Sequence, residues 1–176
     1  MRTGRWGGAL AGLIVAVGWM AAAAAAELED FFGTWRGEAL AETRGDVVEP
    51  ITTRDLDVSI VPEGEADGFT VTWSTVLRAG EGDGARKTAS RTFRPSGRPG
   101  IWRTRGPGDP MRQAGYAWAR LMDQTLSVYT LTITDTGGYE MHVYDREIDG
   151  DAMTLRFTRL EDGRVLRLVS GRLRRQ

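Results

Sequence analysis

The sequence of 176 residues contains no cysteine and no asparagine, a single histidine, His142, and a single lysine, Lys87. The missing cysteines exclude disulfide bonds, thiolate metal sites and a cysteine nucleophile, and the missing asparagines exclude N-glycosylation. A zinc site with two or more imidazole ligands is excluded as well. A Ser-His-Asp triad would have to use His142, and a Schiff base would have to use Lys87. We therefore predict no catalytic residue, no metal site and no cofactor.

Residues 1–26 have the pattern of a secretory signal peptide. Two arginines precede an apolar run over residues 6–20, which six alanines follow. A charged start, an apolar core and small residues at an A-x-A cleavage site are typical of export signals. We predict cleavage after residue 26, which leaves residues 27–176 as one domain without a membrane span. An uncleaved anchor is the alternative, because the apolar segment is long enough to cross a bilayer. An arginine-rich, asparagine-free chain suggests a GC-rich bacterial genome, so we expect a periplasmic or secreted protein.

From Gly33 onward the chain has the pattern of short β-strands separated by glycine and aspartate turns. In one of them, Leu56, Val58 and Ile60 alternate with polar residues, which places the three apolar side chains on one face. Helical periodicity is nearly absent. The predicted strands are Thr34–Thr43, Arg54–Val61, Phe69–Ala79, Arg86–Arg94, Ile101–Arg105, Tyr116–Met122, Leu126–Thr134, Tyr139–Ile148, Met153–Leu160 and Val165–Leu173.

This spacing predicts an all-β fold, and tight turns between successive strands favour a single antiparallel up-and-down β-barrel of about 8–10 strands. Gly137-Gly138, Asp149-Gly150 and Asp162-Gly163 are typical hairpin turns. Closing the sheet into a barrel also removes exposed strand edges. A barrel of about eight strands has an interior that holds one small ligand or is filled by its own side chains.

The opening Gly33-Thr34-Trp35 resembles the Gly-x-Trp motif of the calycin group, which comprises lipocalins, fatty-acid-binding proteins and avidins. The resemblance implies a lipocalin-like barrel in which Trp35 closes one end beneath an arginine of the last strand. We take Arg172 for that arginine, with Arg167 and Arg174 as the other candidates, and cation–π stacking as the contact. Gly33, Trp35 and Arg172 are therefore the predicted barrel plug.

We predict an exported, non-enzymatic barrel that binds a small apolar or amphipathic, lipid-like molecule in its interior. Aromatic residues from many strands would form the walls, and Arg120 or His142 would orient a polar head. Strand alternation places Glu140, His142, Tyr144 and Arg146 on one face. The candidate ligand-binding residues are Trp73, Trp102, Tyr116, Trp118, Arg120, Tyr129, His142 and Tyr144.

Two alternatives remain open at this point. In the first, the barrel core is filled and the protein is a structural or interaction module of the cell envelope. Its binding surface would then be residues 86–122, which carry nine basic side chains and one acidic one. Alternatively, His142 ligates haem iron, as a single imidazole can. An interior pocket of at least ~300 Å³ would favour ligand binding over a filled core. Nucleic acid is not expected as a partner, because it is rarely the partner of an exported acidic protein. We expect the basic strands to pair with acidic neighbours in the sheet.

Overall fold

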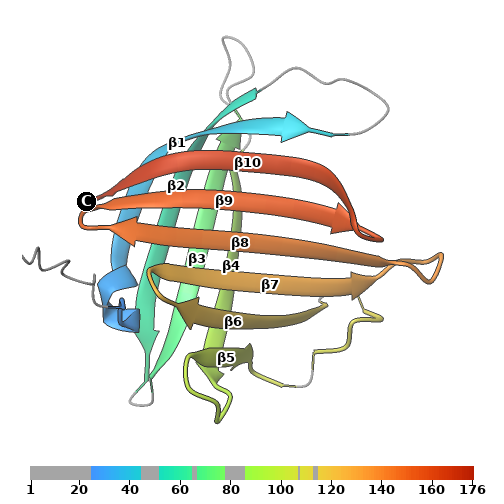
Figure 1. Cartoon of the computed structure of the whole chain (residues 1–176), viewed down its shortest axis with the longest axis horizontal. Coiled ribbons are helices and arrows are strands. Elements are labelled where there is room, and N and C mark those ends of the chain that lie inside the picture. Colours follow the sequence, from blue (N-terminus) through green and yellow to red (C-terminus); the bar gives the residue numbers. More distant parts are fainter. Residues whose placement is uncertain (1–24, 45–51, 65–66, 78–85, 107, 113–114) are drawn as a thin grey trace, which may run out of the picture.

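The structure, a computed structural model, describes residues 25–44, 52–64, 67–77, 86–106, 108–112 and 115–176. It confirms the predicted fold class: ten antiparallel strands close into one barrel, each pairing with its sequence neighbours and the first pairing with the last (Figure 1). The elements are η1 (Leu28–Phe31, a 3₁₀ turn), β1 (Gly33–Thr43), β2 (Thr52–Glu63), β3 (Gly68–Leu77), β4 (Arg86–Pro95), β5 (Ile101–Thr104), β6 (Tyr116–Met122), β7 (Thr125–Ile133), β8 (Tyr139–Asp149), β9 (Ala152–Glu161) and β10 (Arg164–Arg175).

The strands form where apolar and polar residues alternate, and they end at residues that tolerate a positive φ. Asp123, Gly150 and Asp162 all have φ between about +45° and +60° in the turns that follow β6, β8 and β9. Glycine and aspartate tolerate this left-handed conformation better than branched residues do. The turn chemistry therefore fixes the register of each hairpin, and with it the face to which every side chain points.

Residues 1–24 of the predicted signal segment lie outside the described residues. The described chain begins just before η1, where the Glu27 amide donates to Asp30 Oδ2 at 2.9 Å and the Ala26 amide donates to the Asp123 carbonyl at 2.9 Å. Among the residues that the structure describes, no helix is long and apolar enough to cross a membrane.

One end of the barrel is closed by Trp35, which is fully buried and donates its indole N–H to the Phe31 carbonyl at 3.0 Å. The guanidinium of Arg175 lies over the Trp35 ring, 4.1 Å from its centroid. It also donates to the carbonyls of Asp30, at 2.7 Å, and Phe32. Arg175 thus ties the last strand to η1 while it covers the tryptophan.

The structure places Arg175 rather than Arg172 on Trp35. β10 extends two residues beyond the predicted Leu173, and Arg175 is the residue directly opposite Trp35 in the β1–β10 ladder. Arg172 has the opposite parity in the strand and is exposed on the outside of the barrel. Gly33 has φ of +127° at the start of β1, next to the Arg175 side chain.

Gly37 allows β1 and β10 to approach closely. A Cβ atom there would lie 2.1 Å from the Arg172 carbonyl oxygen and 2.8 Å from the Leu173 Cα. These are backbone atoms, so they cannot rotate away as a side chain does. We expect Gly37→Ala to lower the free energy of unfolding by about 1–3 kcal/mol, as overpacking does. Urea unfolding measures this. Ser170→Ala, at an exposed position of β10, is the control, and equal stability of the two variants would contradict the close approach.

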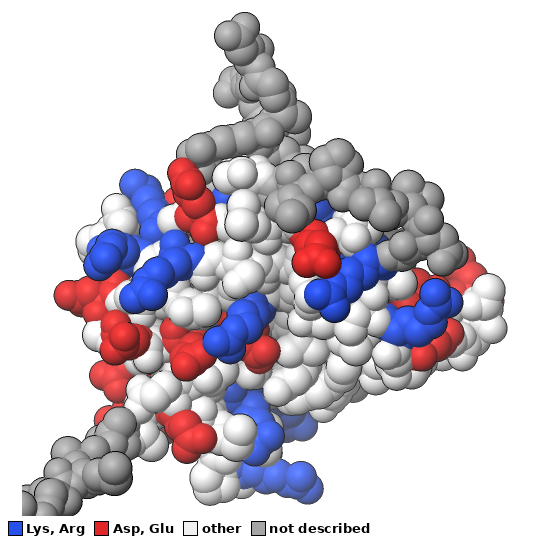
Figure 2. Space-filling model, turned by 45° about the horizontal axis from the view of Figure 1, so that its top comes forward, with Lys and Arg blue, Asp and Glu red and all other residues white. Residues whose placement is uncertain are grey.

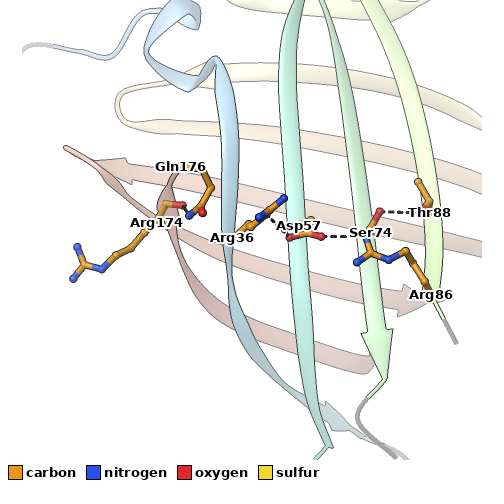
Figure 3. Close-up of polar contacts among 7 residues, drawn as sticks. All are labelled: Arg36, Asp57, Ser74, Arg86, Thr88, Arg174 and Gln176. Atoms are coloured by element: carbon orange, nitrogen blue, oxygen red, sulfur yellow. Dashed lines mark hydrogen bonds and ion pairs between the residues drawn. The ribbon is translucent and has the colours of Figure 1, made fainter. Parts of the chain in front are cut away.

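The outer face carries polar ladders in which acidic and basic side chains alternate. Asp57 lies between Arg36, at 3.2 Å, and Arg86, at 3.1 Å, and the next strands pair Ser74 with Thr88 at 2.8 Å (Figure 3). Figure 2 shows basic and acidic side chains interspersed over one face of the barrel. Arg86 of the basic 86–122 stretch therefore pairs with an acid two strands away, at an exposed contact that contributes little stability.

Candidate functional site

The barrel interior has an apolar end and a polar, positively charged region. The apolar end, beside η1, is filled by fully buried side chains that include Phe31, Trp35, Ile60, Phe69 and Phe93. Farther from this end, the inward-facing positions of several strands become polar. On β8, the inward row reads Glu140, His142, Tyr144, Arg146 and Ile148. The inner face therefore carries both apolar and cationic side chains.

Between these regions lies a cavity of about 140 Å³. Its lining comes from β2, β3, β8, β9 and β10, so strands distant in sequence converge on it. Within the part of the chain that the structure describes, the lining contains aliphatic, aromatic and cationic side chains but no carboxylate. The lining residues are Arg54, Leu56, Val58, Trp73, Thr75, Tyr144, Arg146, Leu155, Phe157, Arg167 and Val169.

Arg146 is the most unusual of these residues. It is fully buried, and all three of its guanidinium nitrogens lack a hydrogen-bond partner among the described residues. The Tyr144 ring, 5.7 Å from the guanidinium carbon, provides a cation–π contact but no hydrogen-bond acceptor. Burial lowers the pKa of Arg146 to about 10, with the neighbouring Tyr144 and Asp145 opposing the shift. Arg146 nevertheless carries its charge at neutral pH.

Arg54 and Arg167 bring two further cations to the same cavity. The Nε atom of each is buried without a hydrogen-bond partner among the described residues. Burial lowers the pKa of Arg54, and the like charge of Arg167 lowers it further. The two side chains are therefore close enough to repel each other. Neither forms an ion pair with an acid in the part of the chain that the structure describes.

Aromatic rings form one wall of the cavity. The Tyr144 ring lies 5.3 Å from Trp73 and 4.7 Å from Phe157, centroid to centroid. Burial raises the pKa of Tyr144 above its ordinary value, so this phenol is neutral at physiological pH. The wall therefore offers flat apolar surface, and it supplies no negative charge to the arginines.

His142 is part of a separate polar group on the inner face. Its Nε2 atom lies 2.7 Å from Glu140 Oε1, outside hydrogen-bond geometry, and Arg159 donates to the other oxygen of the same carboxylate. Burial lowers the pKa of His142, an effect that Glu140 opposes and that Arg159 and Arg91 reinforce. Within the described residues, no group of three or more His, Asp or Glu side chains is arranged to hold a metal ion.

The structure divides the candidate ligand-binding residues between the two faces of the barrel. Trp73 and Tyr144 line the cavity, whereas His142 lies on the inner face outside the cavity lining. Trp102 also points inward, but at the apolar end, where its indole donates to the Asp67 carbonyl at 2.7 Å and packs on Phe69. The remaining four lie on the outer face: Tyr116, Trp118, Arg120 and Tyr129. There the Trp118 ring stacks on Tyr129, 4.8 Å between centroids, and Arg120 is exposed.

Sequence reasoning did not identify the three arginines of the cavity. A signal for two of them was present: Arg54 continues the inward row of Leu56, Val58 and Ile60, and Arg146 shares the face of Tyr144. An arginine in phase with buried residues is the pattern that marks an inward-facing cation.

These features define a closed, up-and-down antiparallel β-barrel with a small, positively charged interior cavity. No protein-family model matches the sequence, and no curated protein matches it either. Among solved structures, the fold is similar to a DUF3598-family protein of unknown function from Nostoc punctiforme, with a TM-score of 0.60 and 16% identity over 86% of this chain and 50% of that chain. This chain thus spans about half the length of that protein.

Two further structures share the fold. Rv2717c from M. tuberculosis has a TM-score of 0.55 and 17% identity, over 85% of this chain and 94% of that chain. The S-type phycobiliprotein lyase CpeS from Guillardia theta has a TM-score of 0.54 and 11% identity, over 84% of this chain and 89% of that chain. At these identities the likeness establishes the barrel fold alone.

Proposed function

We propose that this protein is an exported, non-enzymatic binding protein that holds a small amphipathic molecule in the cavity of its barrel. The observation that carries the proposal is the cavity itself, whose lining combines aromatic and aliphatic walls with unpaired polar donors. Binding sites for small molecules commonly have such a lining, mostly apolar with a few convergent polar groups. Export rests on the signal pattern of residues 1–26.

The size of the cavity narrows the expected ligand. At about 140 Å³ it does not reach the ~300 Å³ that the sequence analysis required for a lipid-like ligand, so the proposal is limited to a smaller molecule. It is close to an engineered cavity of about 150 Å³ that binds benzene. The ligand that this interior accommodates is therefore about the size of one substituted ring or a short acyl chain, rather than a long-chain lipid.

Filling the cavity tests the proposal. Val169 lines it, so Val169→Phe places a ring in the space that the ligand would occupy. Val143→Phe is the matched control, because Val143 has the opposite parity on β8 and faces outward. Tryptophan fluorescence is titrated with benzoate, hexanoate and benzyl alcohol, since Trp73 lies in the cavity wall. We expect saturable binding of at least one probe to wild type and Val143→Phe, and none to Val169→Phe.

Native mass spectrometry of the protein purified after expression of the full chain is the complementary measurement. A co-purifying molecule that is present in wild type and absent from Val169→Phe supports the proposal. If no molecule co-purifies and none of the three probes binds, the interior is not a binding site. That outcome would favour a structural or interaction module of the cell envelope.

A further inference from the structure

We propose that the ligand of this cavity carries an anionic group, a carboxylate or a similar oxyanion, which pairs with Arg146, while its apolar part packs on the aromatic wall. The inference rests on the proposed binding function and specifies the chemical class of the ligand. It assigns Arg146 as the residue that determines specificity for charge, with Arg54 and Arg167 as further cations of the same site.

The cavity is positively charged. Three arginines line it, and among the described residues no carboxylate does. A buried cation without a counter-charge is costly, so buried arginines are almost always paired. Here the three guanidinium nitrogens of Arg146 are buried and lack hydrogen-bond partners among the described residues. The missing counter-charge is therefore the feature that a ligand can supply.

The acids near Arg146 are already engaged elsewhere. Asp145, a residue of β8 on the outer face, accepts a hydrogen bond from Ser127 at 2.6 Å. Glu140, on the inner face, accepts from Arg159 and contacts His142. The Tyr144 ring lies 5.7 Å from the Arg146 guanidinium carbon, and burial raises the pKa of its phenol, which is therefore neutral. The charge of Asp145 favours the charged form of Arg146, but within the described residues none of these side chains accepts a hydrogen bond from the guanidinium.

The shape of the site also fits an organic anion. A guanidinium is a planar fork of donors that matches the two oxygens of a carboxylate, and such charge-assisted hydrogen bonds are stronger than neutral ones. The same cavity has Trp73, Tyr144 and Phe157 as apolar walls. A molecule of the size of benzoate satisfies both requirements at once, with its carboxylate on Arg146 and its ring on the aromatic wall.

Pairs of probes that differ in charge test the inference. Benzoate is compared with benzyl alcohol, and hexanoate with hexanol, by isothermal titration calorimetry on the intact protein. We expect each anion to bind at least about 30-fold more tightly than its neutral partner, and Arg146→Met to remove this preference, because truncating one member of a buried charge pair has an effect of this size. Arg174→Met is the matched control, since Arg174 extends into solvent at the end of β10 (Figure 3).

The outcomes separate this inference from the proposed function. If the neutral and anionic probes bind equally well, and Arg146→Met leaves the affinities unchanged, the cavity binds small molecules but the anion assignment is overturned. If no probe binds wild type, both proposals fail. If inorganic phosphate binds as tightly as benzoate, the apolar wall takes no part in recognition, and the assignment of an amphipathic anion is wrong. A charge preference that disappears only in Arg146→Met supports the inference.

Discussion

Arg146→Met is expected to make the unliganded protein more stable, by about 1–4 kcal/mol in the free energy of unfolding. Replacing buried charges by apolar side chains of similar volume stabilises several proteins by this amount, because the desolvation cost of the charge disappears. Arg146 is fully buried and has no hydrogen-bond partner among the described residues, so little is lost in exchange. Methionine adapts well to irregular interior space. The same variant should lose the preference for anions, so stability and function change in opposite directions.

Urea unfolding at neutral pH, without added organic anion, measures the change. Arg174→Met, the same substitution at an exposed position, should alter the free energy of unfolding by less than about 0.5 kcal/mol. A loss of stability in Arg146→Met larger than that of the control would show that Arg146 has a counter-charge within the protein. Such a result would remove the reason for placing an anionic ligand there.

The increase in the free energy of unfolding expected for Arg146→Met should not depend on pH below about pH 10. Burial lowers the pKa of Arg146 to about 10, so the folded and unfolded chains both bind this proton at lower pH. Above about pH 10 the folded chain loses this proton while the unfolded chain still binds it, so the stability of wild type rises with pH. The advantage of Arg146→Met should therefore be constant between about pH 5 and 9 and shrink only in strong alkali.

Trp35→Ala is expected to lower the free energy of unfolding by about 3–5 kcal/mol, the range for truncating a large buried aromatic residue. Trp35 is fully buried, donates to the Phe31 carbonyl and carries the Arg175 guanidinium on its ring. Removing it leaves a cavity at the closed end of the barrel and frees η1 from the first strand.

Urea unfolding followed by far-UV circular dichroism measures this loss. Trp118→Ala is the control, because Trp118 lies on the outer face and is only partly buried. Arg175→Met is the informative second variant, since it keeps the indole but removes the cation and the hydrogen bonds that it donates to two backbone carbonyls. Equal stability of Trp35→Ala and Trp118→Ala would contradict the assignment of Trp35 as the plug.

The fold could be predicted from the sequence because the strand and turn signals are local. Alternating runs such as Leu56, Val58 and Ile60 define one buried face, and turn residues such as Asp162-Gly163 define where each hairpin reverses. Tight turns between consecutive strands leave few topologies other than an up-and-down barrel. The Gly33-Thr34-Trp35 opening indicated a plug, and Trp35 is indeed fully buried at the closed end.

The site was harder to predict because it depends on the parity of each strand. The run around Tyr129 is apolar on both faces, so its sequence does not show which side points inward. Trp118 and Tyr129 prove to stack on the outside, whereas Trp73 and Tyr144 meet inside. Shifting a strand by one residue exchanges its two faces. Only the closed ladder of ten strands fixes all these parities together.

The three cavity arginines could not be predicted from the sequence for a related reason. Most of the 22 arginines of this chain are exposed or paired on the outer ladders, as Arg36 and Arg86 are with Asp57. Composition alone does not distinguish Arg146 from them. What distinguishes it is an unpaired charge in a buried position, and departures from ordinary burial rules of this kind are expected at functional sites.

The most direct measurement is the NMR signal of the Arg146 Nε–H group during a titration with benzoate, assigned by its absence from the Arg146→Met spectrum. The account predicts that this signal shifts in proportion to site occupancy and reaches a plateau at saturation, and that benzyl alcohol does not reproduce the shift. An Arg146 signal that stays unchanged while benzoate saturates the protein would contradict the account, because the anion would then be bound elsewhere.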